Sequence, residues 1–210
     1  MILFFILLSS IASCALTWYF NKLLVIKYPK YKSNYIRHMM CLSIIINLIL
    51  QSKFLHRTNE FSNLSYTQGI SIIIIAGLLL LTIVSASLAV SFVIDCLYFE
   101  LPDELNLLIC IALIPVSVLL YSGKSIITGI AIFVIYFLIA IFTDSFGMGD
   151  AKLVLGLGMV IKLPLLIKFM FISFLFASIY SIFKMVVFKQ DKKSEIAFGP
   201  FIVLSFLLMF

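Results

Sequence analysis

The residues best suited to chemistry lie in two short acidic stretches. "IDCLYFELPDEL" and "TDSFGMGDAK" together contain Asp95, Glu100, Asp103, Glu104, Asp144 and Asp150. Each stretch borders an apolar run, where an ionisable group is costly and usually faces the interior of a helix bundle or a water-filled cleft. Carboxyl groups in such a place can take up or donate protons.

Asp95 is the first candidate for such a role. It directly follows the uncharged run 70–94, and the four residues after it include no cation. Its carboxylate is therefore expected near the boundary of the hydrocarbon layer, which favours a functional role over a solvated one.

Asp150 is the second candidate, and two interpretations of it stay open. Gly147 and Gly149 precede it, and glycine lets another backbone approach closely and adopts conformations that other residues avoid. Lys152 can hold negative charge near the cluster. The simpler interpretation is a helix N-terminus, where the dipole favours an acid.

The other acids have structural interpretations. Asp103 follows Pro102 and precedes an apolar run, which is typical of a helix N-cap. Glu100 and Glu104 are interpreted as solvated side chains, and Asp144 as a solvated acid in a loop.

The composition defines the elements that must position these acids. The 210 residues are 64% hydrophobic and 11% charged, which predicts an integral membrane protein because such a surface cannot stay hydrated. We expect a single domain, residues 1–210, that forms an all-α, polytopic membrane helix bundle of about seven to eight transmembrane helices. A window of about 19 residues gives the apolar segments 2–20, 38–55, 70–94, 104–122, 125–143, 151–164, 165–186 and 198–210.

The positive charges predict the orientation of this bundle. With the N-terminus outside, most of the 15 Lys and Arg residues fall on the inner side, namely Lys22, Lys27, Lys30, Lys32, Arg37, Lys152, Lys184, Lys189, Lys192 and Lys193. This bias agrees with the positive-inside rule. Two spans separate the acidic stretches, so both return to the cytoplasmic face and their acids can meet there.

The cysteines and the net charge exclude other classes of protein. Cys14, Cys41, Cys96 and Cys110 form no C-x-x-C pair, so neither a metal site nor a disulfide framework is predicted. The pI of about 9.1 reflects basic loops that contact anionic membrane lipid, and no nucleic-acid partner is expected.

Three patterns occur in order from about residue 70 to the end. Ile94-Asp95 is followed by Pro102-Asp103, then by "GMGDAK", and finally by "AFGP". In these patterns the chain resembles the type IV prepilin peptidases, membrane aspartyl proteases that also process competence and secretion pseudopilins. The resemblance implies that Asp95 and Asp150 are the catalytic pair, that the pair titrates as a unit, and that prepilin or pseudopilin precursors are the partners.

One region departs from many members of that family. Their first cytoplasmic loop carries two C-x-x-C pairs that bind zinc and is linked to N-methylation of the product. The corresponding segment here is "NKLLVIKYPKYKSNYIRH", which has no cysteine. We therefore expect no metal and no cofactor, and the sequence does not favour methyl transfer.

The resemblance also suggests how a substrate is held. Prepilins carry a short basic leader on the cytoplasmic side, followed by a glycine and an apolar helix. We expect Glu100, Asp103 and Glu104, with Asp144, to attract the basic leader. Gly147 and Gly149 would give the substrate backbone room at the scissile bond.

Two other functions are weighed against this one. Presenilin-like proteases share G-x-G-D but pair it with Y-D and P-A-L stretches, which this sequence lacks. A small transporter or channel component could instead use Asp95 and Asp150 in a proton or cation path. Their predicted place at the inner edge of the membrane, and not at its middle, disfavours that alternative.

Overall fold

A computed structural model describes residues 2–28, 35–59, 67–121, 123–143, 147–188 and 196–210. This part of the chain is helical and contains no strand. Its elements are α1 (Ile2–Lys27), α2 (Ile36–Asn59), α3 (Thr67–Tyr98), α4 (Asp103–Tyr121), α5 (Ser125–Thr143), α6 (Met148–Gly158), the 3-10 turn η2 (Leu163–Leu165), α7 (Leu166–Phe188) and α8 (Gly199–Met209). The expected all-α membrane bundle is confirmed.

The helices follow the predicted apolar segments in order but differ from them in length. Within the described part of the chain, five stretches are long and apolar enough to cross a membrane: Ile36–Thr58, Ile73–Tyr98, Asp103–Tyr121, Ser125–Phe142 and Leu163–Val187. By contrast, α6 and α8 have 11 residues each, about half of what a crossing needs. The predicted segment 151–164 breaks because α6 ends at Gly158 and Pro164 lies in η2, a common way to stop a helix.

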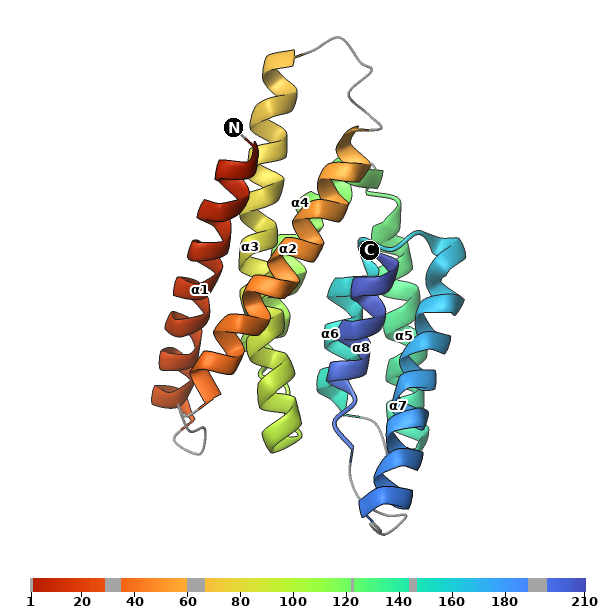
Figure 1. Cartoon of the computed structure of the whole chain (residues 1–210). Coiled ribbons are helices and arrows are strands. Elements are labelled where there is room, and N and C mark those ends of the chain that lie inside the picture. The colour runs from red at the N-terminus through yellow and green to blue at the C-terminus, as the bar shows by residue number, and fades with distance from the viewer. Residues whose placement is uncertain (1, 29–34, 60–66, 122, 144–146, 189–195) are drawn as a thin grey trace.

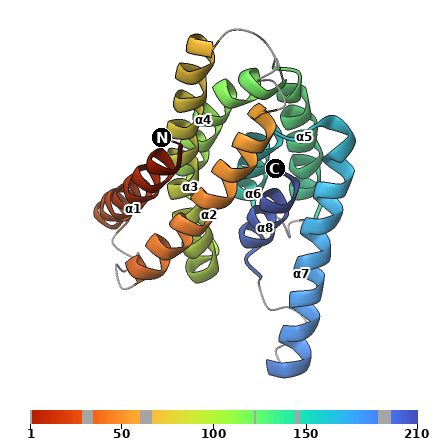
Figure 2. The ribbon, with the colours of Figure 1, turned by 45° about the horizontal axis from the view of Figure 1, so that its top comes forward.

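The helices form two connected groups (Figures 1 and 2). α1, α2 and α3 pack against one another, and α4 lies between α3 and α6. α6 also packs against α5, while α8 packs against α7 and α3. In Figure 1 the C-terminal end of α3 and the N-terminal ends of α4, α6 and α8 point to the lower side of the bundle, where the acids lie.

Two glycines fix the short helix α6 against α5. A Cβ atom on Gly129 would lie 2.7 Å from the carbonyl oxygen of Leu155, and one on Gly158 would lie 2.9 Å from Gly129 Cα. Only residues without side chains allow this approach, as is usual where membrane helices pack tightly. The position of Asp150 is thereby tied to a rigid pair of helices.

A buried polar cluster, which we call the serine–amide network, joins α1, α2 and α3. Its members are Ser9, Ser10, Ser13, Asn47, Gln51 and Ser85. Asn47 Nδ2 donates to the Ser9 and Ser10 hydroxyls at 3.3 Å, and its Oδ1 accepts from Gln51 at 3.1 Å and from Ser85 at 3.3 Å. Polar side chains that bond across helices hold them together in lipid.

The C-terminal end of α8 is held by two cations from α2. Lys53 Nζ donates to the carbonyl oxygens of Leu207 at 2.6 Å and Leu208 at 3.0 Å, and Arg57 donates to that of Met209 at 3.2 Å. Carbonyls at a helix end have no partner within the helix, so these contacts satisfy them. They also fix α8 along its axis.

Candidate active site

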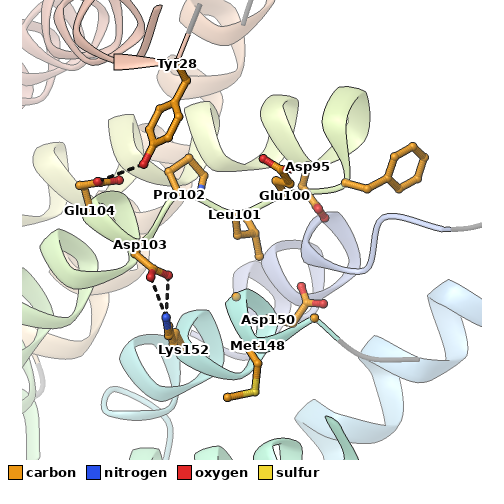
Figure 3. A pocket seen from close by; sticks show the side chains of 13 residues that line it. Tyr28, Asp95, Glu100, Leu101, Pro102, Asp103, Glu104, Met148, Asp150 and Lys152 are labelled. Carbon is orange, nitrogen blue, oxygen red and sulfur yellow. Dashed lines mark hydrogen bonds and ion pairs between the residues drawn. The ribbon is translucent and has the colours of Figure 1, made fainter. Parts of the chain in front are cut away.

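A pocket of about 500 Å³ opens where α1, α3, α4 and α6 end or begin (Figure 3). All eight site residues expected from the sequence line it: Asp95, Glu100, Asp103, Glu104, Gly147, Gly149, Asp150 and Lys152. Asp144 lies outside the described residues. The structure therefore brings the two acidic stretches together at one end of the bundle.

Asp95 lies in the last turn of α3, and only 4% of it is exposed. Its Oδ2 accepts a hydrogen bond of 2.8 Å from the backbone N–H of Gly199, the first residue of α8. The first N–H groups of a helix are unpaired and carry partial positive charge. The short helix α8 thus presents its N-terminus to this carboxylate.

Asp150 lies in the first turn of α6, a helix too short to span, and only 7% of it is exposed. Its Oδ1 is buried without a hydrogen-bond partner among the described residues. Burial raises the pKa of the Asp150 carboxyl, the charge of Asp95 raises it further, and the Gly147 backbone N–H acts in the opposite direction. A carboxyl that served only as a helix cap would not keep an unpaired buried oxygen.

The two acids approach from different elements and share an environment. Figure 3 shows the Asp95 and Asp150 side chains at one wall of the pocket, from the neighbouring ends of α3 and α6. Because the charge of one raises the pKa of the other, they are electrostatically coupled. Like charges this close do not both ionise without cost, so the arrangement favours one shared proton.

Glycines make this assembly possible, although not as the sequence suggested. A Cβ atom on Gly149 would lie 2.8 Å from Leu101 Cβ, so its close neighbour is the α3–α4 turn and not an open space for a substrate. A Cβ atom on Gly199 would lie 2.7 Å from Asp95 Oδ2. Gly147 is exposed at the pocket, and a Cβ there would meet Asp150 Oδ2 at 3.3 Å.

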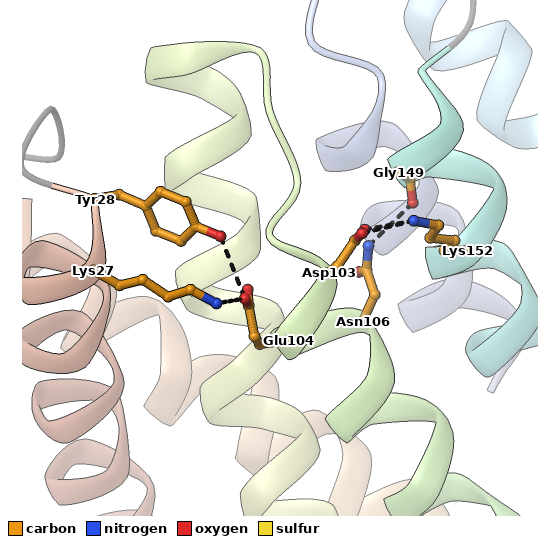
Figure 4. A network of polar contacts seen from close by, with 7 residues as sticks. All are labelled: Lys27, Tyr28, Asp103, Glu104, Asn106, Gly149 and Lys152. Carbon is orange, nitrogen blue, oxygen red and sulfur yellow. Dashed lines mark hydrogen bonds and ion pairs between the residues drawn. The ribbon is translucent and has the colours of Figure 1, made fainter.

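The start of α4 is bound to α6 by two contacts (Figure 4). Lys152 Nζ donates to both carboxylate oxygens of Asp103, at 2.8 and 2.7 Å. Asn106 Nδ2 donates to the carbonyl oxygen of Gly149 at 3.2 Å. The expected N-cap role of Asp103 is wrong, because α4 begins at Asp103 itself and the carboxylate turns to Lys152.

A second ion pair joins the end of α1 to α4. Glu104 accepts a hydrogen bond from Lys27, and the Tyr28 hydroxyl donates to the same oxygen at 3.3 Å (Figure 4). Glu104 is therefore not simply solvated, as the sequence suggested. Glu100 is exposed at the pocket wall.

Several pocket residues were not anticipated from the sequence. Tyr28, Phe99 and Met148 line the pocket, and Asn106 supports the loop before Asp150. Asn106 follows Asp103 by three residues, a spacing that places both on one helix face and could have revealed it. No sequence signal distinguishes Phe99, which lies among other apolar residues.

The described residues around the pocket form no cluster that could bind a metal ion. Within the described ranges, no three His, Cys, Asp or Glu side chains gather where they could hold a metal ion. Both buried aspartates line the same pocket.

Comparison with known proteins agrees with this geometry. A family model described as the type IV leader peptidase family matches residues 81–182, which include both aspartates and the helices from α4 to α6. No curated protein matches the chain, and no solved structure does. Over residues 81–182, the chain is similar to the type IV leader peptidase family.

Proposed function

We propose that this chain is a membrane aspartic endopeptidase that removes the short basic leader from prepilin-like or pseudopilin precursors. The single observation that carries the proposal is the meeting of two buried aspartates, Asp95 and Asp150, in one pocket. They come from helices separated along the chain and lie within the part that matches the peptidase family. We treat residues 1–210 as one peptidase domain.

The contacts of the two acids suggest how they divide the work. Asp95 accepts a hydrogen bond from Gly199, which suits the carboxylate that takes the proton of the attacking water. Asp150 has a buried oxygen without a partner, which suits the protonated acid that donates to the carbonyl oxygen of the scissile bond. When the tetrahedral intermediate collapses, the proton gained by Asp95 passes to the leaving amine, and the hydroxyl formed from the carbonyl oxygen returns its proton to Asp150.

The charge distribution supports a cytoplasmic site. With the N-terminus outside, α1 ends on the inner side at Lys27, and the pocket formed by Tyr28, Asp95 and Asp150 lies at the same end of the bundle. The basic leader of a precursor would then meet the pocket from the cytoplasm, with its apolar helix beside the bundle in lipid.

The acidic wall of the pocket, formed by Glu100, Asp103 and Glu104, is the proposed site for the leader. The structure changes the expectation from the sequence for two of these acids. Asp103 and Glu104 are already paired with Lys152 and Lys27. A basic leader must therefore add to these pairs or exchange with them, while Glu100 is exposed beside them. Replacing Glu100 with Gln should weaken cleavage more at low salt than at high salt, since salt screens exposed charges.

Cleavage by purified protein tests the proposed activity. Wild type, Asp95→Asn and Asp150→Asn, each reconstituted in liposomes, are mixed with a precursor that carries a basic leader and an apolar helix. We expect the shortened product with wild type only, and mass spectrometry of the product locates the cut. Retained cleavage by either variant would contradict the paired-acid mechanism, and a wild type that does not cleave would favour the transporter alternative.

A further inference from the structure

Phe99 has an unusual backbone conformation beside the site. Among the described residues it is the only one other than glycine with a positive φ, 55°. Its N–H donates to the carbonyl oxygen of Asp95 at 2.9 Å, so it closes the last turn of α3. Glycine is the usual residue where a helix ends in this left-handed form, because a bulky side chain is strained there.

The strain at Phe99 is not compensated by burial in the core. The residue is 46% exposed, and it lines the pocket four positions after Asp95. A large apolar side chain in an unfavourable conformation, with much of its surface uncovered, contributes little to stability. Strained residues that persist in this way cluster at binding sites, where the side chain is needed in that place.

A second exposed apolar side chain lies on the other acidic element. Met148 is the first residue of α6, two positions before Asp150, and it is 47% exposed in the same pocket. Figure 3 shows it near Asp150. Methionine is flexible and polarisable, so it adapts to apolar partners of different shape. Each aspartate therefore has an apolar neighbour that faces the pocket.

The pocket thus has walls of two kinds. Glu100, Asp103 and Glu104 form an acidic wall, and Phe99 and Met148 are apolar residues that line the same pocket. A precursor is basic before the cut and apolar after it. It can place its basic part on the acidic wall and its apolar part against Phe99 and Met148 in only one orientation. The leader then lies along the acidic wall, and the first residue of the apolar helix lies against Phe99 and Met148.

We propose that Phe99, with Met148, forms an apolar subsite that binds the side chain directly after the scissile bond. The proposal rests on the proposed function, and it makes Phe99 a specificity-determining residue. Phe99 contributes to substrate recognition, but its backbone is strained. Replacing it with a residue that tolerates the left-handed conformation should therefore weaken the selection of the substrate and raise the stability of the fold.

Two variants separate the side chain from the backbone. Phe99→Leu keeps an apolar side chain and the strain, whereas Phe99→Asn removes the apolar contact and tolerates the left-handed conformation. Each is assayed with two precursors that carry either Leu or Ser directly after the cut. For the Leu precursor we expect roughly a tenfold loss of kcat/KM in Phe99→Asn, mostly through KM, and a loss of less than about threefold in Phe99→Leu.

The ratio between the two precursors is the decisive measurement. Wild type should prefer the Leu precursor, and Phe99→Asn should lose most of that preference, which a role in folding alone would not produce. Tm should be equal or higher in Phe99→Asn, and Phe99→Gly provides a second variant with the same expectation. Phe142→Asn is the control, because Phe142 is 81% exposed near the end of α5 and does not line the pocket.

The failure of this inference differs from the failure of the proposed function. If Phe99→Asn and Phe99→Gly keep the wild-type preference while Asp95→Asn is inactive, the subsite is wrong and the peptidase stands. A lower Tm in both variants together with an unchanged preference also overturns the subsite. If Asp95→Asn still cleaves, the proposed function itself is contradicted.

Discussion

The serine–amide network and the active-site pocket both bury polar groups, but they treat them differently. In the network, Asn47 bonds to Ser9, Ser10, Gln51 and Ser85. At the pocket end of the bundle, by contrast, Asp150 Oδ1, Asn106 Oδ1 and Ser91 Oγ are buried without a hydrogen-bond partner among the described residues. Ser91 lies one turn before Asp95 on α3.

The network joins helices, whereas the unpaired oxygen of Asp150 belongs to a residue that lines the pocket. An unpaired buried polar atom costs about 1 to 3 kcal/mol, so a site used only for packing would be expected to pair it. The family model covers both aspartates and begins at residue 81, after α1 and α2.

Asp150→Asn should have the largest effect on kcat, and it should distinguish the active-site pocket from the serine–amide network most clearly. We expect kcat to fall at least about a thousandfold, since removing one member of a catalytic unit removes most of its effect. Tm should not fall, because a buried ionisable group is replaced by a neutral one. A precursor cleavage assay and thermal unfolding in the same detergent measure both; a large drop in Tm would make Asp150 a structural residue.

Gly199→Ala should come next. The added Cβ atom would lie 2.7 Å from Asp95 Oδ2, so the carboxylate or α8 must move. A displacement of about 1 Å at a reacting group costs roughly a hundredfold in rate. Steady-state kinetics should show the loss in kcat, and Ser52→Ala, at an exposed hydroxyl on α2, is the control. Unchanged kcat in Gly199→Ala would remove α8 from the active site.

Asn47→Leu should instead lower the stability and leave kcat unchanged. It leaves polar partners on α1, α2 and α3 unpaired, which should lower the free energy of unfolding by about 1 to 3 kcal/mol. The remaining folded protein should keep its kcat. Ser52→Ala, which alters an exposed hydroxyl on the same helix, is the matched control and should change neither quantity. A loss of kcat without a loss of stability would contradict the structural role of the network.

The pH dependence of stability should test whether Asp150 titrates in the folded protein. Burial and Asp95 raise the pKa of Asp150 in the folded protein, so folding favours its protonated form. This stabilisation is fully present below the pKa of an exposed aspartate, about 4, and is lost as the pH rises through the raised pKa. Tm of wild type should therefore decline more toward alkaline pH than Tm of Asp150→Asn. Parallel declines would show that Asp150 is not the titrating group.

Asp103→Asn should have the smallest effect. The Lys152–Asp103 pair is partly exposed, with 43% and 66% of the two side chains accessible. Exposed pairs contribute about 0 to 1 kcal/mol, so Tm should change little. Asn106 also binds α4 to Gly149, and Asp103→Asn combined with Asn106→Leu should lower kcat more than either alone. Simple additivity would indicate that the two contacts act independently.

The sequence predicted the helical order and the meeting of the acids, because both follow from hydropathy and from an even number of crossings. It also predicted short segments at 151–164 and 198–210, but it could not place the end of α6 at Gly158, since the apolar run continues past that residue. The partner of Asp103 and the neighbour of Gly149 were also missed. Both depend on how α4 and α6 are rotated toward each other, which only packing decides.

The anchoring of α8 extends the active site well beyond the pocket. This helix of 11 residues is about 16 Å long; Lys53 and Arg57 hold one end, and the other donates to Asp95. Because a helix is stiff, a shift of α8 along its axis at one end also displaces its other end. Loosening Lys53 would therefore change the position of a carboxylate that it never touches, at the far end of a helix about 16 Å long.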